Sequence, residues 1–91
     1  MSPPSYRVVV SATAERVLSR LSEGVAAAVV EFMLGALTES PRRVGHPLSH
    51  ELTGLWAARR GPYRVIYEID DSELLVKVVR IDHRADVYKP R

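Results

Sequence analysis

The stretch from Gly54 to Asp70, GLWAARRGPYRVIYEID, constrains the fold of this chain more than any other part. It predicts two short β-strands joined by a tight turn at Gly61-Pro62, because turns select Gly and Pro. Since side chains alternate along a strand, one face of the second strand carries the apolar residues Tyr63, Val65, Tyr67 and Ile69. That face must be buried, so a second layer of structure has to pack against it.

Two helices are expected to form the second layer. Ser11 is placed to begin the first, since serine favours the N-cap position. The apolar stripe of this helix has helical spacing: Ala14, Val17, Leu18 and Leu21. Ser22-Glu23-Gly24 separates it from a second helix, which the same period extends to about Glu39. Ser40-Pro41 ends that helix, because proline disfavours a helical residue before it.

Four strands are expected around this helical hairpin: Tyr6–Val10, Leu55–Arg60, Tyr63–Ile69 and Leu74–Ile81. The last is so apolar that we expect it to be central and covered on both faces. The order β-α-α-β-β-β predicts an α+β fold, in which two helices pack on a small, mainly antiparallel four-stranded sheet. We expect one domain over residues 1–91, because a chain of this size supports one two-layer core.

Composition excludes several classes of protein. Hydrophobic residues make up 46% of the chain, which is typical of a folded domain rather than a disordered segment. No cysteine is present, so disulfides and thiol chemistry are excluded. The motifs of metal, phosphate-loop and triad enzymes do not occur, so we expect chemistry without metal or cofactor. With neither a signal peptide nor a membrane-spanning apolar run, the sequence predicts a soluble, cytoplasmic protein.

The positive charge is concentrated in one part of the chain. The net charge is only +2, yet the segment 42–64 holds five arginines against one acid, Glu51. These arginines are Arg42, Arg43, Arg59, Arg60 and Arg64. Arginine suits bidentate contacts with phosphate, although a GC-rich genome also raises arginine content throughout a protein. The local concentration indicates a discrete anionic partner.

Histidine and arginine near the end of the last expected strand are candidates for chemistry. His83 lies in the sequence Asp82-His83-Arg84 and could donate or accept a proton at a phosphate held by Arg84. Tyr88 could stack on a base or anchor the tail. His46 precedes Pro47 in a loop just before the cationic ribbon and is a weaker candidate.

Arg64 is expected on the face opposite Val65. Two interpretations remain open for it. Arg64 could pair with Glu68, which lies two positions further on the same face, or it could join Arg59 and Arg84 in an anion-binding patch.

The segment PLSHELTGLWAARRGPYRVIYEIDD, followed by a strand and HRADVY, resembles the RelE/ParE superfamily of bacterial toxins from toxin-antitoxin systems. The RelE and YoeB messenger-RNA interferases are the branch it resembles most. The resemblance extends from Tyr6 to Tyr88. It implies the same α+β fold and a cognate antitoxin partner, with which the toxin forms a hetero-oligomer.

The resemblance also implies a site. RelE-like toxins cleave messenger RNA in the ribosomal A site without metal, by attack of a ribose 2′-hydroxyl on the adjacent phosphate. Arg64 matches the family's phosphate-stabilising arginine, and His83 matches the general acid of YoeB-like members. Arg59, Arg84 and Tyr88 match further site residues. The remaining cations of the segment, Arg43 and Arg60, are expected to contact RNA.

Three positions depart from the family pattern. Leu55 and Ala57 stand where RelE-like enzymes have lysines, and His46 stands where YoeB-like enzymes have a glutamate. His46 is therefore the candidate general base, with Glu51 as the alternative. The resemblance leaves two other functions open, a ParE-like toxin that poisons DNA gyrase by binding and an inactive homologue that only binds its antitoxin.

Overall fold

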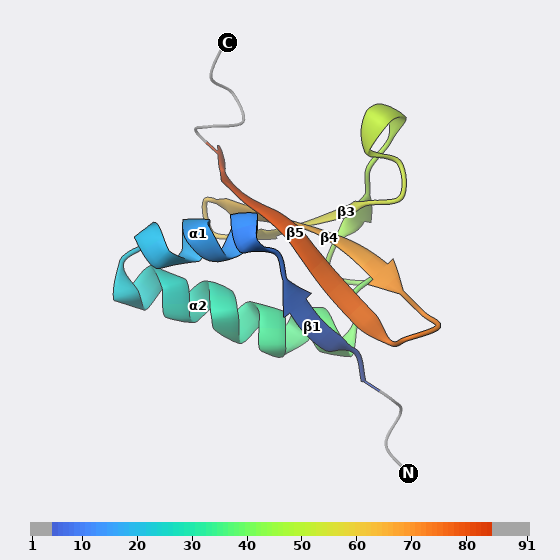
Figure 1. The fold of residues 1–91 in the computed structure, drawn as a ribbon, viewed down its shortest axis with the longest axis horizontal. Coiled ribbons are helices and arrows are strands. Elements are labelled where there is room, and N and C mark those ends of the chain that lie inside the picture. The colour runs from blue at the N-terminus through green and yellow to red at the C-terminus, as the bar shows by residue number, and fades with distance from the viewer. Residues whose placement is uncertain (1–4, 85–91) are drawn as a thin grey trace.

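A computed structural model describes residues 5–84. Its elements are β1 (Arg7–Val10), α1 (Ala12–Arg20), α2 (Glu23–Leu34), α3 (Ala36–Glu39), β2 (His46–Pro47), the 3₁₀ turn η1 (His50–Leu52), β3 (Trp56–Arg60), β4 (Tyr63–Asp70) and β5 (Leu75–His83). The two long helices lie together along one side of the sheet (Figure 1). The α+β class predicted from the sequence is confirmed.

The strands form one mixed sheet in the order β1-β5-β4-β3-β2. The pair β1–β5 is parallel, whereas β5–β4, β4–β3 and β3–β2 are antiparallel. The last strand of the described residues, β5, therefore lies inside the sheet between β1 and β4, as predicted. The connection from β1 to its parallel neighbour β5 contains the helices and the strands β2, β3 and β4, so it exceeds the dozen or so residues that a parallel crossover needs.

The sheet has five strands rather than the predicted four. The additional strand, β2, pairs His46 with Ala57 and Pro47 with Trp56 at the edge of the sheet. Two physical features explain it. A residue before proline favours extended backbone, and proline is tolerated at a sheet edge. In addition, Gly45 lies so close to β3 that an added Cβ would be 2.7 Å from the carbonyl oxygen of Ala57.

Helix α1 begins where the sequence predicts. Ser11 is its N-cap, and the serine Oγ accepts a hydrogen bond from the Ala14 N–H at 3.1 Å. The same Oγ donates to the carbonyl of Val79 at 2.8 Å, which ties the helix start to β5. Glu15 in the first turn complements the helix dipole.

The second helix differs from its prediction at both ends. It begins at Glu23, so the segment that was expected to separate the helices already forms the first turn of α2. It ends at Leu34, and α3 follows after Gly35. Gly35 has φ −104° and ψ −96°, outside the helical region, and glycine is the residue that most weakens a helix interior. The predicted end at Ser40-Pro41 is confirmed for α3.

The core lies between the helices and the inner face of the sheet. Ala14, Val29, Met33 and Leu37 from the helices meet Ala58, Val65, Tyr67, Val76, Val78 and Ile81 from the strands. Tyr63 and Ile69 pack against this cluster. The apolar face predicted for the second ribbon strand is thus confirmed as a core face.

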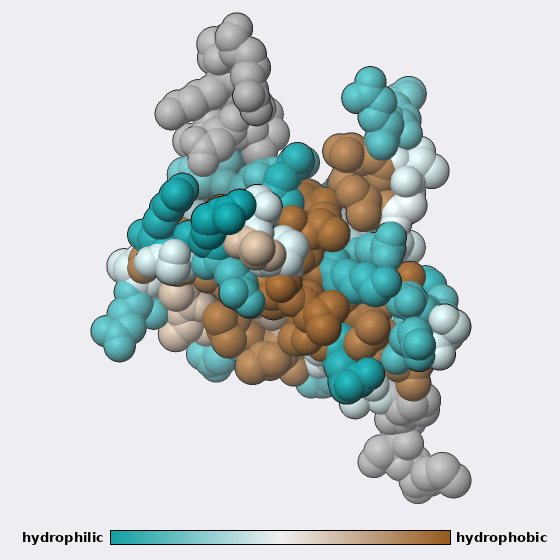
Figure 2. Space-filling model, viewed as in Figure 1, coloured by the Kyte–Doolittle hydropathy of each residue, from teal (hydrophilic) through white to brown (hydrophobic). Residues whose placement is uncertain are grey.

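The prediction that the last strand is covered on both faces is wrong. In β5, Val76, Val78 and Ile81 are buried, whereas Val79 and Arg80 are exposed. Ile66 pairs with Arg80 and Tyr67 with Val78, so Val79 is an extra residue in a β-bulge. Figure 2 shows apolar surface gathered over β1, β5 and α2 in the middle of its view, with polar residues around it.

We call the sheet surface away from the helices the open face. Residues paired across antiparallel strands share a face, and faces alternate along each strand. The register therefore assigns these residues to the open face: Ala57, Arg59, Arg64, Ile66, Glu68, Lys77, Arg80 and Asp82. Of these, Ala57 and Ile66 are buried.

Candidate functional site

The β3–β4 ribbon brings two arginines side by side on the open face. Arg59 pairs with Arg64 directly across the two strands, and Arg64 pairs with Asp82 of β5 on its other side. The turn at Gly61 has φ +61°, a conformation that glycine adopts without strain. The tight turn fixes the register, and the register aligns Arg59, Arg64 and Asp82 in one row across the sheet.

Arg64 is held in place but incompletely paired. Its side chain is 31% exposed, and its Nη2 lies 3.8 Å from Oδ2 of Asp82. Its Nε is buried and has no hydrogen-bond partner among the described residues. A buried guanidinium N–H without an acceptor is costly, so this arginine is suited to binding an oxyanion.

Of the two interpretations left open for Arg64, the structure does not show the pairing with Glu68. Glu68 instead lies 3.5 Å from Nζ of Lys77, its partner on β5. Arg64 does pair with an acid, but that acid is Asp82. The sequence reading missed Asp82 because the pairing depends on the register between β4 and β5, and a β-bulge shifts that register.

Arg80 is a second residue that sequence reasoning missed. Its Nε donates a hydrogen bond to Oδ2 of Asp82 at 3.0 Å. The two residues are two positions apart on a strand and therefore share a face, which is a signal that the sequence contains. Arg80 adds a third guanidinium to the open face beside Arg59 and Arg64.

His83 lies on the other side of the sheet. It pairs with Tyr63, and the two rings contact edge to face with centroids 5.0 Å apart. A hollow of about 270 Å³ here is lined by Val17, Arg20, Leu21, Tyr63, Ile81 and His83. The structure thus directs the side chains of Arg64 and His83 to opposite faces, although their backbones lie on neighbouring strands.

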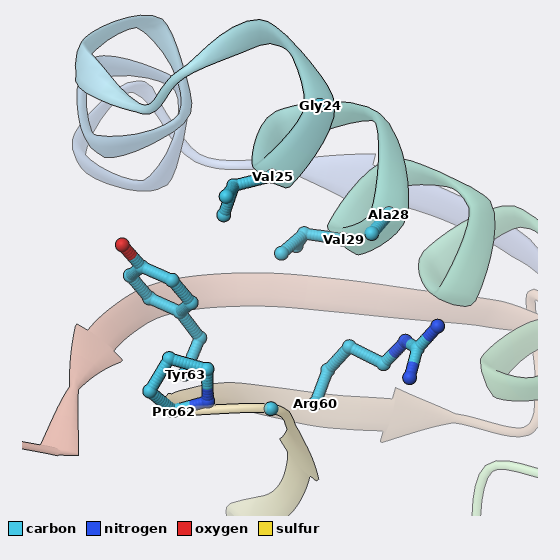
Figure 3. Close-up of a pocket in the computed structure, with 8 residues that line it drawn as sticks. Gly24, Val25, Ala28, Val29, Arg60, Pro62 and Tyr63 are labelled. Atoms are coloured by element: carbon cyan, nitrogen blue, oxygen red, sulfur yellow. The ribbon is translucent and has the colours of Figure 1, made fainter.

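Arg60 also leaves the open face. Figure 3 shows its side chain extending from β3 toward α2, on the same side as Tyr63. There it borders a hollow of about 250 Å³ whose lining residues are Gly24, Val25, Ala28, Val29, Arg60, Gly61, Pro62 and Tyr63. The two neighbouring arginines of the ribbon therefore belong to different surfaces.

The other predicted site residues are dispersed. His46 is exposed on β2, and its pairing with Ala57 assigns it to the open face. Arg43 is exposed in the turn that follows α3. Arg84 is exposed, and its backbone N–H donates to the carbonyl of Pro62 at 2.7 Å. Tyr88 lies outside the described residues.

Arg42 has a structural partner. Its guanidinium makes two hydrogen bonds to the Asp71 carboxylate, at 2.6 and 3.2 Å. It also lies 5.9 Å from the ring centroid of Trp56. The Arg42 hydrogen bond holds the pKa of the Asp71 carboxyl below its usual range, and the Tyr6 hydroxyl adds to this effect. Of the five arginines in the segment 42–64, only Arg59 and Arg64 are brought together on the open face.

This arrangement can bind a phosphate group and offers an imidazole on the same face. Arg59 and Arg64 supply the guanidinium donors, and His46 is the histidine that shares their side of the sheet. Between residues 5 and 84, no group of three or more His, Asp or Glu side chains is placed to hold a metal ion.

The fold and its cationic ribbon identify the class of protein. Residues 6–88 match the family model of the ParE toxin of the type II toxin-antitoxin system, parDE. The chain therefore belongs to this family of toxins, and the resemblance to the RelE/ParE superfamily is confirmed. None of the helices in the described range is long and apolar enough to cross a membrane.

Individual relatives place the chain near RelE-like members. Toxin RelG of Mycobacterium tuberculosis is 50% identical over 84 residues, which cover 92% of this chain and 97% of that relative. Toxin RelE of the same organism is 49% identical, covering 92% of this chain and 87% of that relative. The toxin-antitoxin complex RelBE2 of M. tuberculosis contains a chain that matches with a TM-score of 0.85 and 48% identity. That match covers 89% of this chain and 100% of the other.

Proposed function

We propose that this toxin is a metal-independent, ribosome-dependent endoribonuclease. It cleaves messenger RNA in the ribosomal A site, stops translation in the cytoplasm, and is neutralised by a cognate antitoxin in a hetero-oligomeric complex. Membership of the toxin family supports this proposal, as do two relatives of about half-identical sequence that are named toxins RelG and RelE. We treat residues 1–91 as one toxin domain.

One observation carries the proposal more than any other. Arg59 and Arg64 lie side by side on the open face, and the buried Nε of Arg64 has no partner in the described structure. The rest of the Arg64 side chain is accessible, since the side chain is 31% exposed, and a guanidinium binds phosphate with two parallel hydrogen bonds. The strand backbone holds both arginines, so little ordering is needed when the anion binds.

The chemistry requires a base, a cation and an acid. The 2′-hydroxyl must lose a proton as it attacks the phosphate, negative charge develops on the phosphate oxygens, and the 5′-oxygen must gain a proton as it leaves. In this proposal Arg64 and Arg59 stabilise the phosphate charge, and His46 accepts the proton from the same face.

His83 donates a proton only after the end of β5 turns toward the open face, since its ring now rests against Tyr63. Arg84 and Tyr88 are expected to hold the nucleotide beside the cleavage site.

Primer extension on a message translated in a purified system tests the proposal. The wild-type chain is expected to give cuts at A-site codons, and Arg64→Ala is expected to reduce them by at least about 100-fold, the loss typical of removing one electrostatic stabiliser. Arg16→Ala removes an exposed arginine of α1 and is the matched control. Absence of cuts with folded wild-type protein, or full cutting by Arg64→Ala, would contradict the assignment.

A second function, poisoning of DNA gyrase by binding, is favoured by two observations. The matching family is that of the ParE toxin, and the side chains of Arg64 and His83 lie on opposite faces. Expression without an antitoxin separates the possibilities. Translation arrest supports the nuclease, filamentation with DNA damage supports gyrase poisoning, and unimpaired growth indicates an inactive homologue.

A further inference from the structure

Asp82 places a carboxylate inside the cationic cluster of the open face. Its Oδ2 lies 3.0 Å from Nε of Arg80 and 3.8 Å from Nη2 of Arg64. The register sets Arg59 on the far side of Arg64 in the same row. The Asp82 side chain is only 19% exposed, so solvent screens its interaction with these guanidinium groups less than at an open surface. One carboxylate oxygen of Asp82 therefore forms ion pairs with two arginines, Arg80 and Arg64.

The interaction of Asp82 with Arg80 is closer than its interaction with Arg64. The Arg80 contact has hydrogen-bond geometry, whereas the Arg64 contact, at 3.8 Å, is an ion pair longer than a charge-assisted hydrogen bond of ~2.8 Å. The Nε of Arg64 is buried and has no acceptor among the described residues. Asp82 thus neutralises part of the charge of Arg64 without satisfying its donors. A tetrahedral oxyanion with several free oxygens would satisfy them better.

We propose that Asp82 is an internal anion that competes with a phosphate group for Arg64 and thereby weakens phosphate binding on the open face. An incoming phosphodiester displaces the Asp82 contact from Arg64, while Arg80 retains the carboxylate. That the phosphate belongs to RNA rests on the proposed function. The competition itself rests only on the geometry of Arg64, Arg80 and Asp82.

The pair Arg42–Asp71 provides a matched comparison within the same chain. It joins the same two residue types at 2.6 Å, but Asp71 is more exposed and lies away from the open-face row. Asp71→Asn changes the net charge by the same amount as Asp82→Asn. A general effect of charge on anion binding would therefore appear in both variants, whereas a local competition at Arg64 would appear in Asp82→Asn alone.

Titration of the purified full chain with inorganic phosphate, followed by amide NMR shifts at β3 and β4, tests the proposal. Asp82→Asn is expected to bind phosphate about five-fold tighter or more, which corresponds to the upper end of the range for an exposed ion pair. Asp71→Asn is expected to equal the wild type. In the Arg64→Gln background the gain from Asp82→Asn is expected to disappear, since the competition acts through Arg64. Thermal unfolding of each variant checks that it is folded.

Several results would overturn the inference. These are unchanged or weaker phosphate binding by folded Asp82→Asn, an equal gain in Asp71→Asn, and persistence of the gain without Arg64. Failure of every variant to bind phosphate would also overturn it. Failure of the nuclease proposal is distinguishable from failure of this inference. It would appear as absent cleavage in the translation assay, while Asp82→Asn would still bind phosphate more tightly than the wild type and Asp71→Asn.

Discussion

Tyr67 couples the stability of the fold to alkaline pH. It is fully buried in β4, and its hydroxyl donates a hydrogen bond of 2.5 Å to the carbonyl of Pro41. Burial disfavours the phenolate and raises the pKa of Tyr67 from 10.0 to about 12. The folded state therefore holds the phenol proton through a pH range in which the unfolded chain releases it.

The sign and size of the effect follow from this raised pKa. The stabilisation is complete below pH 10 and is lost as pH rises through about 12, because only the unfolded chain ionises in between. Two pKa units correspond to about 2.7 kcal/mol of unfolding free energy. That is a large part of the ~5–15 kcal/mol that stabilises a typical domain.

Urea unfolding of the wild type and Tyr67→Phe across this pH range measures the effect. Near neutral pH, Tyr67→Phe is expected to be less stable by about 1–3 kcal/mol, because the buried carbonyl of Pro41 loses its donor. At pH 12 the difference in unfolding free energy between wild type and Tyr67→Phe is expected to shrink by most of the ionisation energy, since phenylalanine does not ionise.

Tyr6→Phe, which removes an exposed hydroxyl bonded to Asp71, is the control at neutral pH and is expected to cost less than about 1 kcal/mol. A constant difference between wild type and Tyr67→Phe from neutral pH to pH 12 would contradict this account.

Three further predictions concern the ribbon and its surroundings. Gly45→Ala is expected to destabilise the fold by about 1–3 kcal/mol in urea unfolding, because the added Cβ would be 2.7 Å from the carbonyl oxygen of Ala57. Arg59→Ala is expected to reduce RNA cleavage in the translation assay about ten-fold or more, whereas Arg60→Ala is expected to change it less than two-fold, because only Arg59 lies on the open face. The hydrogen bond from Arg42 lowers the pKa of Asp71. The Arg42–Asp71 pair therefore stabilises the fold fully above the usual pKa of 3.8, and this stabilisation is lost as pH falls through the lower folded-state pKa. In Asp71→Asn, the unfolding temperature is expected to lose this dependence on acid pH.

Local pattern predicted the elements that depend on local chemistry. The alternation of Tyr63, Val65 and Tyr67 predicted the core face of β4 because a strand has a fixed period of two. Ser11 predicted the start of α1 because its side chain can accept a hydrogen bond from the first turn. These features need no knowledge of distant residues.

The features that were missed depend on contacts between distant segments. Whether Arg64 meets Glu68 or Asp82 is decided by the β4–β5 register, which the bulge at Val79 shifts. The strand at His46 also needs the edge of β3 as its pairing partner. A long apolar run such as LLVKVVRI indicates a strand, but it does not predict whether one face or both faces of that strand are buried.

The period of the strand also determines how the cations of the ribbon can act. A step of one residue, from Arg59 to Arg60 or from Asp82 to His83, moves a side chain from the open face to the helix side. Phosphate binding at Arg64 and proton donation by His83 thus require either a movement of the end of β5 or a different proton donor. If His83 acts without such movement, its effect on cleavage passes through residues that its ring contacts, among them Tyr63, and Tyr63→Ala would then reproduce part of the loss seen in His83→Ala. If the end of β5 does turn, Tyr63→Ala removes one contact that holds the His83 ring on the helix side and would leave cleavage intact, so the two substitutions together distinguish these routes.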